Sequence, residues 1–183
     1  MKFTLHTIES APEASKPLLE KSQQAFGNLP GLHQVMAEAP AVLAAYQQLH
    51  ELFLQTSFNA EELTVVWQTI NVEHKCHYCV PAHTAIAHMM KVDPALTEAL
   101  RNGDPMPNAK LQTLHDTTLE MVRNRGHISE EQLAAFEAAG YGPQQLLEIT
   151  LGLSQKVMSN YINHFAETPV DKAFQQYAWT PNQ

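Results

Sequence analysis

A chain of 183 residues, 44% of them hydrophobic, is long enough for one domain with a sizeable core. A formal net charge of -8, with only 11 Lys and Arg residues, argues against electrostatic binding to nucleic acid or anionic lipid, which needs clustered basic residues. Because no signal peptide and no run of roughly 18 apolar residues is present, we expect a soluble cytoplasmic protein, one domain over 1–183, without nucleic-acid or membrane partners.

Helix start and stop signals recur along the first part of the chain, whereas the alternation typical of strands never persists. Ser10 and Glu13 form a capping box, which predicts a helix that ends at Gly27. Apolar residues at helical spacing predict helices over about 30–37 and 41–55. A second capping box, Asn59 with Glu62, opens a run that is apolar on most faces and therefore predicts a buried helix.

Helix start and stop signals continue to the end of the chain. A helix is predicted from about Cys76 to Lys91, where Asp93 and Pro94 break it. Further helices are predicted over about 94–100, 108–125 and 129–139, and a long one from Pro143 that ends before Pro169. The last residues, about 169–183, are expected to form an arm. All of these signals predict an all-α fold.

The two cysteines of the chain, Cys76 and Cys79, stand in a single C-x-x-C tetrapeptide. A disulfide that closes so short a loop constrains the unfolded chain very little, so a purely structural bridge is a poor explanation. The pair therefore either cycles between dithiol and disulfide or holds a metal ion.

The spacing of nearby side chains favours redox chemistry. On a helix, His83 lies one turn after Cys79 on the same face, where its imidazole can take the thiol proton. Glu73 lies on the same helix face as Cys79 and His83 if the helix begins early enough to include it, and its carboxylate would then orient the imidazole ring of His83. A helix N-terminus and Lys75 both lower the pKa of a thiol. These relations predict Cys79 as the attacking sulfur and Cys76 as the resolving one.

Three other interpretations of the same residues stay open. A zinc site could combine the cysteines with His74, His77 or His83, although no second cysteine pair is present. The cysteines could also be buried thiols with a packing role only. A third interpretation is a lactone decarboxylase or other proton-transfer enzyme that uses His83 and Glu73. His164, on the last long helix, is either a neighbour of the site or a histidine at a helix end.

The block from Asn71 to His83, with its C-x-Y-C-x-x-A-H pattern, resembles the AhpD-like alkylhydroperoxidase branch of the carboxymuconolactone decarboxylase superfamily. The order of helices, the segment RNRGHISEEQLAAFEAAGY and the ending from Leu153 to His164 resemble peroxidase-related members of that family. The resemblance covers nearly the whole chain.

This resemblance implies an all-α fold with the C-x-x-C at a helix start, homo-oligomers (trimers or hexamers), and peroxide reduction without a haem or metal cofactor. In the family scheme Cys79 attacks the peroxide and becomes a sulfenic acid. Cys76 then condenses with it to a disulfide, which an external dithiol reduces. The decarboxylase members lack the C-x-x-C, so its presence favours the redox branch.

Two positions depart from the best-known type of this family. That type has a glutamate twelve positions before the first cysteine, where this chain has Thr64. Glu73 is the nearest substitute. Tyr78 stands where the best-known type has a histidine between the cysteines. These departures leave two functions open, a slow peroxidase and a partner in dithiol–disulfide exchange.

Overall fold

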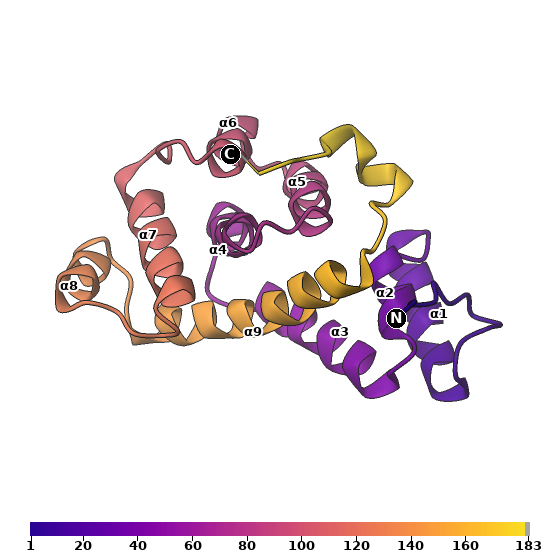
Figure 1. Ribbon diagram of the computed structural model, residues 1–183. Coiled ribbons are helices and arrows are strands. Elements are labelled where there is room, and N and C mark those ends of the chain that lie inside the picture. Colours follow the sequence, from indigo (N-terminus) through magenta and orange to yellow (C-terminus); the bar gives the residue numbers. More distant parts are fainter. Residues whose placement is uncertain (182–183) are drawn as a thin grey trace.

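A computed structural model describes residues 1–181 of the protein (Figure 1). Every regular element in this range is a helix, which confirms the predicted all-α fold. In chain order the elements are η1 (Glu13–Ser15), α1 (Lys16–Phe26), α2 (Gly31–Met36), α3 (Pro40–Leu54), α4 (Ala60–Glu73), α5 (Cys79–Met89), α6 (Pro94–Asn102), α7 (Ala109–Arg123), α8 (Glu130–Ala138), α9 (Pro143–Ala166) and η2 (Lys172–Tyr177).

Helix α4 occupies the centre, where it packs against α5, α6, α7 and α9 (Figure 1). All residues from Glu62 to Asn71 are buried, which confirms the buried helix predicted here. The predicted capping box is also present. The Asn59 side chain accepts a hydrogen bond from the Glu62 amide, and the Glu62 carboxylate accepts one from the Asn59 amide, both at 3.0 Å.

Helix α9 crosses α3 and α4 with a polar face turned inward. Gly152 allows this close approach, because a Cβ there would lie 2.7 Å from the ring of Phe53. The polar residues that α9 buries recur at helical spacing: Gln155, Lys156, Ser159, Asn160 and Asn163. The large apolar side chains that it leaves exposed are Leu147, Tyr161 and Phe165.

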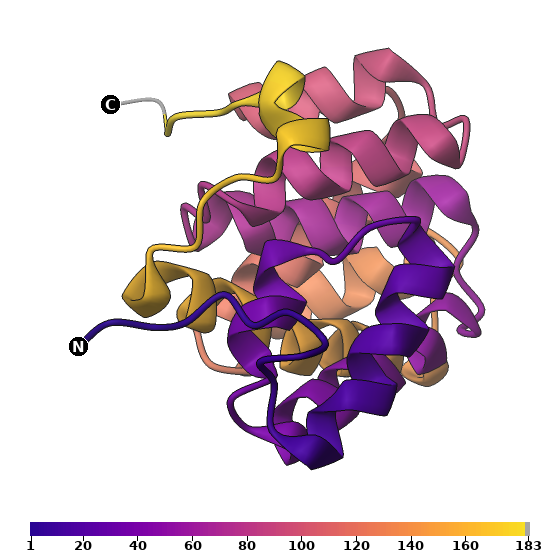
Figure 2. The same cartoon turned by 90° about the vertical axis from the view of Figure 1, so that its right-hand side faces the viewer.

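The C-terminal segment, yellow in Figure 2, lies beside α5. In the arm predicted at the C-terminus, η2 packs against α5. The Asp171 carboxylate accepts hydrogen bonds from the Gly31 amide, at 3.0 Å, and from the Tyr78 hydroxyl, at 2.6 Å. The arm therefore ties the start of α2 to the loop that carries the cysteines. Residues 182–183 of the predicted arm lie outside the described residues.

Two local predictions were wrong. Ser10 caps no helix: its hydroxyl accepts from the Thr7 amide at 2.9 Å, and helical structure starts only at Glu13, after the extended Pro12. The helix predicted from Cys76 instead begins later, at α5. Among residues 1–181, no helix combines the length and the apolarity needed to cross a membrane.

Candidate active site

The cysteines sit in the turn between α4 and α5. Lys75 adopts a left-handed conformation, with φ 53°, which ends α4 and redirects the chain. Cys76 follows in the turn, and Cys79 is the first residue of α5. The Cys79 amide donates a hydrogen bond to the Cys76 sulfur at 3.3 Å, and both thiols are reduced and buried. The pair thus lies at a helix N-terminus, where the free N–H groups favour a negative charge.

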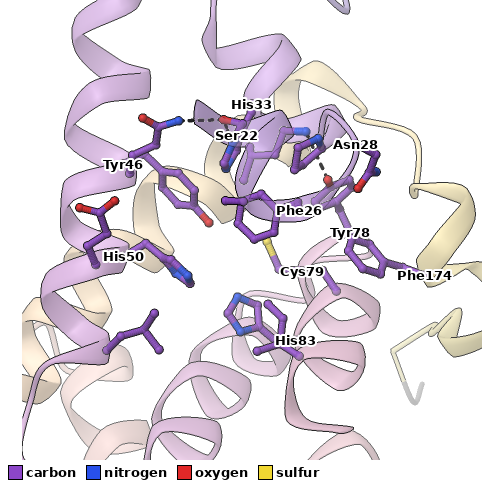
Figure 3. A pocket seen from close by; sticks show the side chains of 18 of the residues that line it. Ser22, Phe26, Asn28, His33, Tyr46, His50, Tyr78, Cys79, His83 and Phe174 are labelled. Atoms are coloured by element: carbon purple, nitrogen blue, oxygen red, sulfur yellow. Dashed lines mark hydrogen bonds between the residues drawn. The ribbon is translucent and has the colours of Figure 1, made fainter. Parts of the chain in front are cut away.

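A cavity of about 350 Å³ leads to Cys79 (Figure 3). Much of its wall is aliphatic or aromatic, with Phe26, Leu32, Tyr46, Leu54, Ile86 and Phe174. Burial lowers the pKa of both His33 and His50, which also face it, to about 4, so these rings are neutral near pH 7. A cavity of this size and lining suits a small, largely apolar molecule.

A buried lysine of α9, Lys156, lies beside His83. Lys156 is 0% exposed, and its Nζ is 2.7 Å from the Nε2 of His83. Burial, followed by the charges of Lys156 and His50, holds the pKa of His83 well below its usual value. The neutral ring therefore accepts a hydrogen bond from Lys156 through Nε2 and carries its own proton on Nδ1. In the described part of the chain, that Nδ1 has no hydrogen-bond partner.

The surroundings of Cys79 favour its thiolate. Burial alone would raise the pKa of this thiol, but a hydrogen bond from Cys76, the charge of Lys156, and hydrogen bonds from Ser159 and Asn163 together lower the pKa of Cys79 well below its ordinary value. The Asn163 Nδ2 donates to the sulfur at 3.3 Å. The pKa of Cys76 is raised by its hydrogen bond to Cys79 and by burial. This asymmetry agrees with the predicted order, in which Cys79 attacks and Cys76 resolves.

A titration tests this electrostatic arrangement. Because a lowered pKa keeps the charged form present at lower pH, we expect about one thiolate per chain to persist as the pH falls from about 8 to 6. An ordinary thiol with a pKa of about 8.5 would be almost fully protonated at the lower end. The ultraviolet absorbance of the thiolate measures this, with the C79S variant as the blank. A midpoint near the ordinary value would show that these surroundings do not lower the pKa of Cys79.

The structure does not bring Glu73 into the site. The stripe expected to run from Glu73 to His83 is interrupted, because Lys75 separates α4 from α5. The Glu73 carboxylate instead accepts two hydrogen bonds from Arg123, at 2.8 and 2.9 Å, and does not line the cavity. His164 is exposed in the last turn of α9. Nothing in this geometry supports either residue as a partner of the sulfurs.

Tyr78 does line the cavity, but its hydroxyl is engaged elsewhere. It donates to Asp171 and accepts from the Leu32 amide at 3.3 Å. Burial and the nearby Asp171 carboxylate raise the pKa of Tyr78, so the phenol keeps its proton. Its position between the cysteines therefore links the site to α2 and to the C-terminal arm.

The histidines considered for zinc are bound to other groups. His74 Nδ1 is 2.9 Å from the Asn160 side-chain oxygen, and His77 Nε2 is 2.9 Å from the Thr168 carbonyl. Over residues 1–181, no group of three or more His, Cys, Asp or Glu side chains is placed to hold a metal ion.

Sequence reasoning missed the residues that α3 and α9 bring to the sulfurs. Lys156, Ser159 and Asn163 come from α9, and the Tyr46 phenol of α3 lies beside Gln155 and Ser159. One signal was present, since the polar residues that α9 buries recur at helical spacing along the helix. Such a stripe is usually the solvent-facing side of a helix, whereas here it faces the core.

No protein-family model and no curated protein matches the sequence. Among solved structures, the chain is similar to the alkylhydroperoxidase AhpD core of an uncharacterized peroxidase-related protein from Ralstonia eutropha JMP134, with a TM-score of 0.83. The two are 16% identical over 94% of this chain and 93% of that chain. The chain has the AhpD-like fold.

Two further solved structures are similar to this chain, one of a peroxidase-related protein and one of a debrominase. An uncharacterized peroxidase-related protein from Silicibacter sp. TM1040 has a TM-score of 0.79 and 18% identity over 95% of this chain and 92% of that one. The debrominase Bmp8, in complex with 2,3,4-tribromopyrrole, has a TM-score of 0.79 and 16% identity over 96% and 95%. These structures confirm the AhpD-like fold that the cysteine motif suggested. Because the fold occurs in peroxidase-related proteins and in a debrominase, it does not by itself identify the activity of this chain.

Proposed function

We propose that the protein is a thiol peroxidase in which Cys79 is the nucleophile. The observation that carries this proposal is the asymmetry of the buried pair. Cys79 has a lowered pKa, opens onto the cavity and lies near the Lys156 ammonium, while the Cys76 thiol donates a hydrogen bond to it. A thiolate that is kept charged and next to a second thiol is what a two-cysteine cycle requires.

In the first step the Cys79 thiolate attacks the outer oxygen of a hydroperoxide, ROOH. The O–O bond breaks, Cys79 becomes a sulfenic acid, and the alkoxide RO⁻ takes up a proton to leave as ROH. In the second step the Cys76 thiol attacks the sulfenic sulfur, which forms the disulfide and releases water. An external dithiol then supplies two electrons and two protons to restore both thiols.

The cavity supports an organic hydroperoxide as the substrate. Hydrogen peroxide needs only a fraction of the 350 Å³ available and makes no use of an apolar wall. The Nδ1 of His83 is buried and has no hydrogen-bond partner in the described part of the chain, so a peroxide oxygen that reaches it would accept its unused proton. The identity of the external dithiol and the expected homo-oligomer, a trimer or hexamer, stay predictions.

The test is a stoichiometric titration of the reduced protein with cumene hydroperoxide, in the absence of any other reductant. We expect each hydroperoxide consumed to remove both thiols of one chain and to yield one equivalent of the alcohol. Both thiols surviving an excess of hydroperoxide would overturn the proposal.

A second candidate, reductive debromination of an aromatic ring, is favoured by one observation. The same apolar cavity would accept a brominated aromatic compound, and the debrominase Bmp8 has this fold. The two thiols would supply two electrons, so that the products are the debrominated ring, bromide, a proton and the disulfide. Tribromopyrrole in place of hydroperoxide tests this: bromide release with loss of both thiols, and no reaction with hydroperoxide, would replace the first proposal by the second.

A further inference from the structure

Lys156 is a buried charge that no carboxylate neutralises. None of the ion pairs between described residues includes it. The one carboxylate on the described wall of the cavity, Glu51, is 50% exposed and pairs with Lys21 at 2.6 Å. A lone ammonium in such surroundings is strongly unfavourable, so a proton on Lys156 requires an anion close by.

The ionisable groups around Lys156 leave one choice for this anion. Apart from Glu51, which pairs with Lys21, the α2 and α3 groups on the cavity wall that face the site are imidazoles and a phenol, which are neutral near pH 7. Helix α4 contributes the indole of Trp67 to this cluster. Only a thiol can supply the negative charge. The imidazoles, the phenol and the thiols around Lys156 belong to His33, Tyr46, His50, Cys76, Cys79 and His83.

In the reduced site the Cys79 thiolate therefore balances the charge of Lys156. Oxidation of Cys79, first to the sulfenic acid and then to the disulfide, removes that anion and leaves nothing in its place. A buried ammonium that loses its counter-ion tends to give up its proton. In the first of these steps the alkoxide that leaves the peroxide requires a proton.

We propose that Lys156 stores the proton that the leaving oxygen takes up, that His83 passes it on, and that the disulfide form of the site contains a neutral lysine amine. This inference rests on the proposed peroxidase function. The alkoxide takes the Nδ1 proton of His83 while Nε2, 2.7 Å from Lys156, takes a proton from the ammonium. The ring stays neutral and exchanges one tautomer for the other, so the sum of the step is RO⁻ and ammonium to ROH and amine.

Reduction of the disulfide reverses this proton movement. The external dithiol delivers two electrons and two protons, of which one ends on Cys76 and the other on Lys156. Cys79 returns as the thiolate beside the restored ammonium. Lys156 thus acts through His83 and sets the charge state of the site, without itself contacting the reacting oxygen.

The pH dependence of the disulfide potential tests this inference without any peroxide. If Lys156 gives up its proton, two protons accompany two electrons, and the potential falls by about 59 mV per pH unit, since each tenfold change in the equilibrium constant is 29.6 mV. If Lys156 stays charged, only one proton is exchanged and the slope is about 30 mV. The measurement is equilibration of the native protein in dithiol buffers of known potential between about pH 6 and 8.

The steep slope supports the inference where the ultraviolet absorbance shows Cys79 as a thiolate over the same pH range; a steep slope without that absorbance overturns it, because two protonated thiols also exchange two protons. The shallow slope overturns the inference while leaving the peroxidase proposal intact. If no disulfide forms even in the most oxidising buffer, both fail. Because the native protein is used, the result does not depend on a variant that folds.

A variant provides a second readout. Lys156→Met keeps a long, apolar side chain but removes the ammonium, so the Cys79 thiol should return to a pKa of at least about 8.5, and its single-turnover oxidation at pH 7 should fall at least about 30-fold. Lys172→Met, the same change at an exposed position of η2, should keep the native rate and thiolate absorbance. A folded Lys156→Met protein that retains its thiolate would overturn the role of Lys156.

Discussion

Cys79→Ser should lose peroxide reduction completely, because a serine hydroxyl does not ionise in this site and cannot attack the O–O bond. Cys76→Ser should instead react once and stop, since the Cys79 thiolate remains but nothing resolves its sulfenic acid. The serine hydroxyl of C76S can still donate a hydrogen bond to the thiolate, so the first step should survive. Peroxide consumption under single- and multiple-turnover conditions, with a diketone probe for sulfenic acid, measures both effects.

The pair of variants also tests the order of the two sulfurs. In a site with the reverse order, Cys76→Ser would be inactive and Cys79→Ser would trap the sulfenic acid. That outcome, or two variants that turn over peroxide like the native protein, would contradict the assignment made from the surroundings of Cys79.

Gly152→Val should be strongly destabilising, although it lies away from the sulfurs. A Cβ at this position lies 2.7 Å from Phe53 and 3.1 Å from Val66, so α9 must move away from α3 and α4. We expect a loss of about 3 kcal/mol in the free energy of unfolding, and a fall in the melting temperature of roughly 6–12 °C. Since Lys156 lies one turn further along α9, the Cys79 thiolate should be lost as well.

The matched control is Ser154→Val, which adds the same side chain to an exposed position of the same helix. Its cost should be limited to a few tenths of a kcal/mol from helix propensity. Thermal unfolding and thiolate absorbance of the two variants separate the steric effect at Gly152 from a general effect of valine in α9. Equal melting temperatures would show that the contact with Phe53 relaxes without cost.

Local signals predicted the helices well, because capping and termination depend on neighbours in the sequence. Asn59 caps α4 with Glu62, and Gly27 ends α1 in a left-handed conformation, as expected. Ser10 shows the limit of such signals. Its capping pattern is correct in sequence, but the hydroxyl bonds with Thr7, and Pro12 holds the chain extended.

The site was only half predictable, for a physical reason. The positions of Cys76, Cys79 and His83 follow from helical spacing, but the partners of Cys79 and His83 come from a helix more than seventy residues later. Glu73 was misplaced because a single helix was assumed across Lys75, and because Arg123, fifty residues away, binds its carboxylate. Helical spacing shows that the polar residues of α9 share one face, but it does not show which other helix that face packs against.

The depth of the two sulfurs has a consequence for recycling. Cys76 is 0% exposed and Cys79 is 2% exposed, and the rim of the cavity carries the exposed Phe26, Leu54 and Met89. A folded thioredoxin-like surface cannot touch a disulfide placed so far inside. Regeneration then depends either on a dithiol small enough to enter, or on a transient parting of the covering helices, in which case the slow stage of each cycle is the opening motion of the protein and not sulfur chemistry.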